Sequence, residues 1–229
     1  SILGNWKLKN KNSNKPKIVF INCSGGGSRA MIWTFYMLQQ SDSLTNGQLF
    51  NQAHLITGSS GGMIGAAYYR ELALQKETLN HSLYSTHYIN NVSKDLLNPI
   101  AFSITTNDFF FRFKTFKDGN YIYKKDRGFS FEKQLLQNTD NALNKRLRDY
   151  TDPEFNAKIP MLILTPTVIN DGRRMLISSQ PLSFLTSSSS TQQLTNTSII
   201  ENFEFTRLFK NKDANNLKYT SALRMSATF

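Results

Sequence analysis

The first 75 residues contain the same order of elements twice, and this recurrence is what most constrains the fold. Residues 17–23 form an apolar, β-branched run that ends in glycines, and the apolar stretch 28–40 follows with the composition of a buried helix. A second apolar run at 53–57 ends in the glycine-rich turn 58–62 and leads into a second helical stretch at 63–75. Short strands that are apolar on both faces and alternate with helices are typical of a parallel sheet. The chain is therefore expected to be an α/β protein.

The middle of the chain interrupts this rhythm. Six of the 17 phenylalanines fall between residues 102 and 116, mixed with basic residues, and residues 94–150 are interpreted as an insertion into the α/β unit. Within the insertion, residues 131–150 are expected to form a helix. Residues 159–169 predict a further strand. The tripeptide Asn-Asp-Gly at 170–172 then predicts a hairpin turn before the next extended run.

The two ends of the chain are less regular. Residues 1–16 are rich in lysine and asparagine and show no apolar periodicity, so they predict a basic leader or linker, and structure is expected to begin at Lys17. Residues 186–191 form a Ser/Thr run that predicts a surface loop. Small residues gather at 221–229. One large folded domain is thus expected over residues 17–229.

The strongest functional signal is Gly58-Ser59-Ser60-Gly61-Gly62, a G-x-S-x-G motif that lies directly after an expected strand and before an expected helix. Such a turn is so tight that its flanking positions admit only glycine, and it pushes the hydroxyl of the central serine clear of the backbone. The N–H groups at the start of the helix favour negative charge that develops nearby. Ser60 is therefore the candidate nucleophile, in preference to a plain glycine-rich turn.

A second glycine-rich turn, Gly25-Gly26-Gly27, follows the first expected strand. Consecutive glycines let backbone N–H groups point into one concavity, so these three residues and Gly61 are candidate oxyanion donors. A phosphate-binding P-loop would need Gly-Lys-Ser/Thr at its end, which this turn lacks. A dinucleotide site stays open, because the turn matches G-x-G-x-x-A and Asp42 lies roughly where a ribose-binding acid would lie. The oxyanion interpretation is favoured, since the dinucleotide interpretation leaves the serine turn unexplained.

The positions of the histidines exclude the usual Ser-His-acid triad. In α/β-hydrolases the acid and then the histidine follow the serine along the chain. Only His81 and His87 follow Ser60, and the acids before them are Glu71 and Glu77, on or near the helix that the serine begins. The histidines are interpreted as surface or packing residues, so the serine must use another base.

These motifs together resemble the patatin-like phospholipase family. Its members carry a G-G-G-x-R/K-G loop after the first strand, which residues 25–29 match, with Ala30 in place of the last glycine. They carry G-x-S-x-G at the serine turn, which residues 58–62 match in full. Their sheet continues to a small-residue segment that is similar to residues 221–229. The resemblance is strong over the first two strand-turn-helix units, loose over the third strand and good over the last nine residues.

The resemblance implies a patatin-like three-layer α/β/α fold with a mostly parallel central sheet and the Phe-rich segment as an insertion. It implies a lipid acyl hydrolase, either phospholipase A-like or a carboxylester hydrolase, that uses a Ser-Asp dyad. Ser60 would then attack a phospholipid or another lipid ester, without cofactor or metal. Arg29 stands where the family carries a cation beside the oxyanion loop, and there it would favour a phosphate headgroup. Two other functions stay open, a non-catalytic nucleotide-binding α/β module and a degenerate patatin-like interaction protein.

The aspartate of the dyad is the main departure from the family pattern. In the family it lies in an Asp-Gly-Gly or Asp-Gly-Ala motif downstream of the small-residue segment, and no such motif follows that segment here. Asp171, in Asp-Gly-Arg, lies between two strand-like runs and is interpreted as a turn residue. The dyad aspartate is therefore expected beyond Phe229, and the chain by itself is expected to have little activity.

Charge and cysteine content bear on partners and location. The formal net charge is +11, and five of the 27 basic residues are lysines within the first seventeen positions. This excess favours an anionic membrane surface over nucleic acid, for which no motif is present. The single cysteine, Cys23, excludes an internal disulfide and favours a reducing compartment. No apolar stretch is long enough to cross a bilayer. The expected location is cytoplasmic, with association at membranes.

Overall fold

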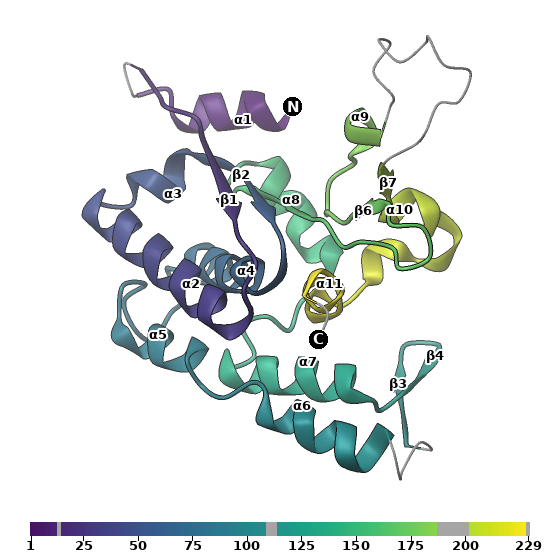
Figure 1. Cartoon of the computed structure of the whole chain (residues 1–229). Coiled ribbons are helices and arrows are strands. Elements are labelled where there is room, and N and C mark those ends of the chain that lie inside the picture. Colours follow the sequence, from purple (N-terminus) through teal and green to yellow (C-terminus); the bar gives the residue numbers. More distant parts are fainter. Residues whose placement is uncertain (13–14, 109–113, 187–201, 228–229) are drawn as a thin grey trace.

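A three-stranded parallel sheet lies at the centre of the fold (Figure 1). The computed structural model describes residues 1–12, 15–108, 114–186 and 202–227. Its sheet has the order β1-β2-β5, formed by β1 (Val19–Cys23), β2 (Ala53–Gly58) and β5 (Met161–Leu164). Cys23 aligns with Gly58, and Gly58 with Leu164, so the three strands end at the same edge. The predicted α/β class with a parallel sheet is confirmed, including the third strand.

Two long helices follow the first two strands and pack on one face of this sheet. They are α2 (Gly27–Leu44) and α4 (Ser60–Leu74), and the short α3 (Gln48–Gln52) lies between them in the chain. A Cβ at Gly65 would overlap the carbonyl oxygen of Met31, so the missing side chain is what lets the two helices approach closely. Residues 61–72 of α4 are all buried. The serine turn is therefore continuous with the most enclosed helix of the molecule.

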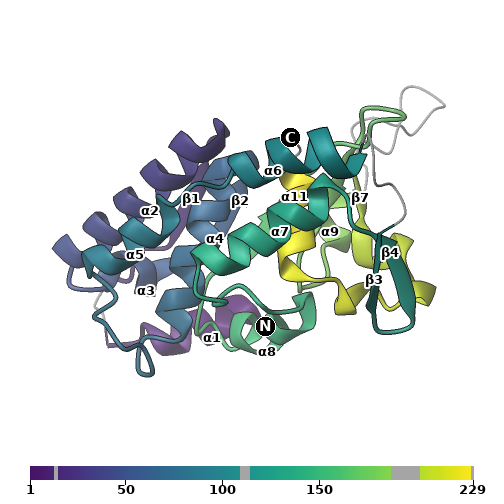
Figure 2. The ribbon, with the colours of Figure 1, turned by 90° about the horizontal axis from the view of Figure 1, so that it is seen from below.

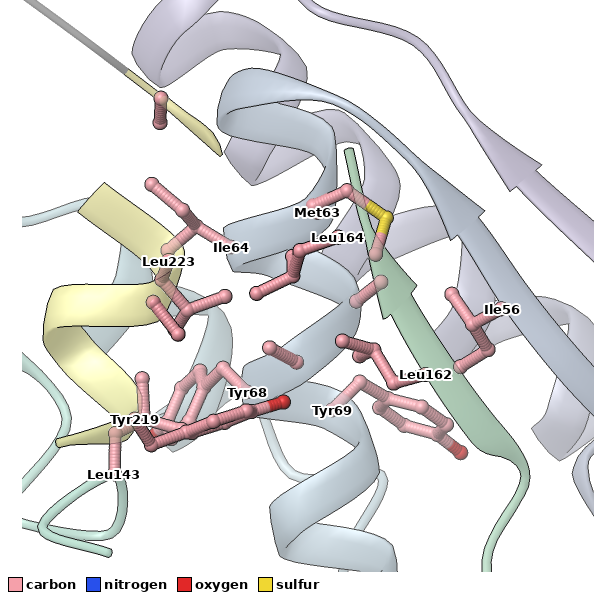
Figure 3. Close-up of a cluster of buried hydrophobic side chains, with 14 of the residues drawn as sticks. Ile56, Met63, Ile64, Tyr68, Tyr69, Leu143, Leu162, Leu164, Tyr219 and Leu223 are labelled. Carbon is pink, nitrogen blue, oxygen red and sulfur yellow. The ribbon is translucent and has the colours of Figure 1, made fainter. Parts of the chain in front are cut away.

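The last helix, α11 (Tyr219–Ser226), packs beside α4 and runs antiparallel to it. Figure 3 shows Leu223 beside Ile64 and Tyr219 beside Tyr68. These side chains join Ile56, Leu162 and Leu164 of the sheet in one hydrophobic core. Because α11 runs opposite to α4, the carboxyl end of α11 lies at the end of α4 where Ser60 lies.

The outer face of α2 departs from the expectation of a helix buried on all sides. Met31, Phe35 and Leu38, spaced four and three residues apart, are buried toward α4. Trp33 is 62% exposed, and Tyr36 and Met37 are also exposed. A sequence that is apolar on all sides of a helix is compatible both with burial of one face and with burial of every face, so the pattern did not predict the exposed side of α2.

The N-terminal residues are folded onto the body, so the expectation that structure begins at Lys17 is wrong. Residues Ile2–Lys9 form helix α1, and Trp6 is buried. The Trp6 Nε1 donates a hydrogen bond to the Gln52 carbonyl (3.0 Å), and Lys9 Nζ donates one to the Ala157 carbonyl (2.9 Å). A third long-range hydrogen bond runs from Asn5 Nδ2 to the Phe155 carbonyl (2.7 Å). One buried indole and three long-range hydrogen bonds thus hold a helix that shows no apolar periodicity.

The opposite face of the sheet is covered by α1 and by the segment after β5. Met161, Ile163, Leu176 and Leu182 form a small second cluster there, against which Ile2 packs. The predicted hairpin turn at 170–172 is confirmed, since the chain reverses there and residues of β6 (Arg174–Leu176) and beyond bridge back to 164 and 167. The parallel partner of β6 is β7 (Asn202–Glu204).

The expected insertion contains helices and one hairpin. Helix α5 (Thr86–Val92) precedes it in the chain. In chain order the elements of the insertion are α6 (Asn98–Ser103), a π-helical turn (Ile104–Asp108), β3 (Thr115–Asp118), β4 (Tyr121–Lys124) and α7 (Arg127–Asn138). The predicted helix at 131–150 is right for its first part only. Asp126 caps α7 by accepting a hydrogen bond from Phe129 N (3.0 Å), and the positive φ angles of Asp140 and Asn141 end the helical region. A short 3-10 helix (Leu147–Tyr150) and α8 (Thr151–Phe155) follow.

The remaining described elements lie at the C-terminal side of the chain. They are α9 (Ser183–Thr186), α10 (Phe205–Leu208) and two 3-10 turns, Lys210–Lys212 and Ala214–Asn216. The predicted Ser/Thr loop falls, apart from Thr186, outside the described residues. None of the helices within the described ranges is long and apolar enough to cross a membrane.

Candidate active site

Ser60 lies at a sharp turn between β2 and α4, as the motif predicts. Gly58 ends β2, Ser59 is extended (φ −146°), and Ser60 is the first residue of the helix with φ +56°. A left-handed φ is uncommon for a residue with a side chain and costs free energy, and such strain gathers at functional sites. The Ser60 side chain is half-buried. The turn therefore has the backbone conformation that exposes a nucleophilic hydroxyl.

The glycines of the serine turn are required by close packing. A Cβ at Gly58 would overlap the carbonyl oxygen of Cys23, and its φ of +142° disfavours any side chain. A Cβ at Gly61 would overlap the carbonyl oxygen of Gly27. The sequence motif indicates that these positions need glycine, and the tertiary structure shows why: the two glycine-rich turns are in contact.

The amino ends of α2 and α4 meet at this contact. Neither N-cap residue, Gly26 for α2 and Ser59 for α4, caps its helix with a side chain. The first N–H groups of both helices thus keep their partial positive charge at one place. This arrangement favours negative charge on an oxygen held beside Ser60.

The predicted oxyanion glycines are gathered around Ser60. The position of a Cβ on Gly25 would lie 3.3 Å from the Ser60 Cβ, so the glycine turn passes directly beside the serine. Gly25 and Gly26 are exposed, and their N–H groups donate no hydrogen bond to any described residue. Gly27 contacts Gly61. All four glycines named from the sequence therefore belong to one local cluster with Ser60.

The hydrogen bonds of the turn hold it in place but supply no base. Ser59 N donates to the Cys23 carbonyl (3.2 Å), and Thr165 Oγ1 donates to the Gly58 carbonyl (3.0 Å). Thr165 was not identified from the sequence, because only the alignment of β5 with β2 brings it to the turn. Within the described residues, Ser60 Oγ makes no hydrogen bond to a carboxylate or an imidazole.

The histidines lie in other environments, in line with the expectation that they are surface or packing residues. His81 and His87 stack on each other with ring centroids 4.3 Å apart, and His87 Nε2 lies 3.3 Å from Asp140 Oδ2. His54, on β2, makes edge contacts with Trp6 and another aromatic ring, and burial lowers its pKa. None of them forms a described hydrogen bond with Ser60.

Asp42 and Asp171, considered above as a ribose-binding acid and a catalytic acid, have structural roles. Asp42 is buried and accepts hydrogen bonds from Phe50 N (2.8 Å), Tyr69 Oη (2.7 Å) and Tyr84 Oη (3.2 Å). A carboxylate with three protein donors is not placed to bind a ribose, and this counts against the dinucleotide interpretation. Asp171 binds Arg173 within the turn (2.6 Å), and this arginine lowers the pKa of Asp171.

Arg29 lies on the first turn of α2 with an exposed side chain. It borders an apolar groove of about 340 Å³ lined by Ile32, Trp33, Tyr36 and Ile89. Arg29 forms no ion pair with any described residue. Its position two residues after Gly27, on the first turn of α2, is compatible with contact to an anionic group of a substrate.

A buried charge network lies at the other end of α4. Arg70 pairs with Glu154, and Arg70 Nε donates to the Pro160 carbonyl (2.9 Å). Tyr150 Oη donates to Glu71 Oε2 (2.6 Å), and burial raises the pKa of Glu71. Since eleven residues of helix rise about 16 Å, Glu71 cannot act on Ser60. Sequence patterns did not reveal this network, because its partners come from distant segments.

No three side chains of His, Cys, Asp or Glu come together in the described part of the chain in a way that could hold a metal ion. A scan against protein-family models finds no match, and a comparison with curated proteins finds none either.

Proposed function

We propose that this chain carries the nucleophile and oxyanion site of a patatin-like serine lipid acyl hydrolase. The observation that carries the proposal is Ser60 at φ +56°, half-buried where the uncapped amino ends of α2 and α4 meet. A plain glycine-rich turn does not require a strained serine at this point. The proposal extends to a patatin-like arrangement in which α2, α4 and α11 are one helical layer on the sheet.

The proposed reaction follows from the geometry of the cluster. Ser60 Oγ would attack the carbonyl carbon of a lipid ester and pass its proton to a carboxylate. Collapse of the tetrahedral intermediate would break the ester C–O bond, and the alcohol would leave with that proton. The N–H groups around Gly26, Gly27 and Gly61 would bind the oxyanion, and removing one such donor typically lowers the rate by about 10²–10³. Water would then hydrolyse the acyl-serine and release the fatty acid. Arg29 would contact an anionic headgroup.

The proposed base is the aspartate of the family's Ser-Asp dyad, which the resemblance places after the small-residue segment. Residues 221–226 of the small-residue segment lie in α11, and Figure 3 shows Leu223 of this helix beside Ile64, one turn after the start of α4 at Ser60. We propose that the reaction takes place at a cytoplasmic membrane surface.

Labelling with a fluorophosphonate probe tests the nucleophile. We expect Ser60 in the 229-residue protein to be labelled, and the label to be lost in Ser60→Ala. Ser59→Ala is the matched control, because Ser59 is the adjacent, exposed serine of the same turn. Peptide mass spectrometry identifies the labelled residue. Equal labelling of wild type and Ser60→Ala, or no labelling of either, contradicts the proposal and favours a non-catalytic interaction protein.

A further inference from the structure

A cavity of about 360 Å³ is lined by residues of elements that lie on the side of the molecule away from α2 (Figure 1). Its walls come from the β3–β4 hairpin, α7, the segment 205–218 and α11, which lie together in Figure 2. The lining includes no residue of the two glycine-rich turns. Its volume is in the range of small-molecule sites. The cavity is therefore separate from the proposed hydrolase site.

One wall of the cavity is an aromatic face of the hairpin. Phe116 is paired across the strands with Tyr123, and Asp118 with Tyr121, so these four side chains share a face. Phe116 packs on Phe129 with ring centroids 4.6 Å apart. Tyr121 and Tyr123 nevertheless remain 48% and 46% exposed. Their rings are therefore available to a bound molecule.

The opposite wall also presents an aromatic ring. Phe209 packs on Phe205 with centroids 4.8 Å apart and stays 39% exposed. Leu217 and Met225 also line the cavity and add apolar surface to it. A flat or extended apolar group would fit between rings that face the cavity from both sides.

The charged groups at the cavity are biased toward positive charge. Asp118 accepts two hydrogen bonds from Arg146 (2.6 and 2.8 Å), and Lys218 lies 3.7 Å away, so two cations surround one carboxylate. Arg146 lowers the pKa of Asp118, which keeps that carboxyl ionised and paired. Lys124 and Lys212, also in the lining, have no ion-pair partner among the described residues.

The other carboxylates of the lining are mostly engaged. Glu132 accepts hydrogen bonds from Ser221 (2.9 Å) and Arg224 (2.8 Å), and Asp126 caps α7. Asp213 is the remaining acid of the described lining. Neither Asp126 nor Asp213 forms an ion pair with a described residue, so the positive bias is the one charge by which the cations of the lining exceed its carboxylates. The cations are Lys124, Arg146, Lys212, Lys218 and Arg224, and the carboxylates are Asp118, Asp126, Glu132 and Asp213. A ligand with a negative head would gain from this imbalance.

We propose that this cavity binds an amphipathic anion, with an apolar body between Tyr121, Tyr123 and Phe209 and an anionic head near Lys124 and Lys212. The head is a carboxylate or a phosphate monoester, and the two are separated by experiment. The site is independent of Ser60, so it holds whether or not the protein is a hydrolase.

Binding of four twelve-carbon amphiphiles, each below its critical micelle concentration, tests the proposal by isothermal titration calorimetry. The probes are dodecanoate, dodecyl phosphate, dodecyltrimethylammonium and dodecyl maltoside. We expect both anions to bind at least about tenfold more tightly than the cation and the neutral probe. The ratio between the two anions identifies the preferred head. Tighter binding of the cation, as in an aromatic cage, or equal binding of all four probes overturns the proposal.

Two pairs of substitutions locate the binding. The double variant Lys124→Glu/Lys212→Glu is expected to weaken anion binding about tenfold, and Tyr123→Ala/Phe209→Ala about tenfold as well. All four side chains are exposed, so the variants are expected to fold, which circular dichroism checks. Ser60→Ala is expected to bind as wild type does.

Matched controls distinguish this cavity from other surfaces. Lys76→Glu changes a lysine whose side chain is 63% exposed at the end of α4, and Trp33→Ala removes the main ring of the other apolar groove. Neither is expected to change anion affinity by more than about twofold. Loss of binding in Trp33→Ala, together with unchanged binding in Tyr123→Ala/Phe209→Ala, assigns the anion to the groove on α2 and refutes the proposal.

Discussion

Replacing Arg70 by methionine is expected to destabilise the fold strongly. Arg70 is 1% exposed, pairs with Glu154, and donates hydrogen bonds to the Pro160 carbonyl (2.9 Å) and Tyr219 Oη (3.3 Å). Its guanidinium also lies 4.6 Å from the centroid of the Tyr150 ring. Methionine fills much of the same volume but leaves the Glu154 carboxylate buried without its cation.

The magnitude follows from that uncompensated charge. Removing one partner of a buried ion pair costs about 3–5 kcal/mol, because the other charge stays desolvated. For a domain of this size each kcal/mol lowers the melting temperature by about 2–4 °C, so the variant is expected to melt roughly 6–20 °C below wild type. The same loss should appear as a lower urea midpoint at neutral pH.

The loss is expected to depend on pH with a definite sign. Burial raises the pKa of Glu154, and Arg70 opposes this shift. Without Arg70 the folded-state pKa rises further above the unfolded value, so the folded state binds the proton more tightly. The stability of Arg70→Met is then greatest at low pH and falls as pH rises from the unfolded pKa through the folded pKa. The variant should therefore lose less stability at pH 5 than at pH 8.

A double-mutant cycle tests this reasoning, with stability measured by urea unfolding and circular dichroism at pH 5 and pH 8. The variants are Arg70→Met, Glu154→Gln and the double variant, which replaces the pair by two neutral groups. The double variant is expected to be more stable than Arg70→Met, with a coupling of about 1–3 kcal/mol. A loss below about 1 kcal/mol in Arg70→Met, or a loss that does not change with pH, refutes the reasoning.

Two further substitutions test the N-terminal helix and the serine turn. Trp6→Ala should lower the free energy of unfolding in urea by about 3–5 kcal/mol, because the indole is buried. Leu8 is exposed on the same helix, so Leu8→Ala should change that free energy by less than about 0.5 kcal/mol. Equal effects of the two substitutions would mean that α1 does not pack on the body of the protein. Gly61→Ala should abolish fluorophosphonate labelling, because its Cβ would overlap the carbonyl oxygen of Gly27. Gly172→Ala, where a Cβ meets nothing within 4 Å, should keep the label; retained labelling in Gly61→Ala would show that the two turns are not in contact.

Local patterns were sufficient for the centre of the molecule. The runs at 17–23 and 159–169 contain β1 and β5, and the run at 53–57 covers β2 except for its last residue, Gly58. The turn 58–62 holds Ser60 at the start of a helix. These features could be predicted because a buried parallel strand, a tight turn and a helix start each have a short-range residue signature. The motif also predicts Gly61 as a residue of this turn.

Other features depended on which distant segments meet. No apolar periodicity marks residues 1–16, yet one indole finds a site beside Gln52 and thereby holds α1 in place. The apolar sequence of α2 does not indicate that the face around Trp33 is exposed in the described part of the structure. The helix expected at 131–150 stops early, because Asp140 and Asn141 adopt left-handed φ angles that neither residue type requires.

The sequence by itself determined the order of strands, turns and helices in the first 75 residues and the position of the candidate nucleophile. Only the tertiary structure decided that Gly27 contacts Gly61, that α11 runs antiparallel to α4, and that Arg70 finds Glu154. The physical reason is the range of the interactions. Backbone conformation and strand burial are set by neighbouring residues, whereas close contacts, ion pairs and cavities arise between segments that the sequence separates by tens of positions.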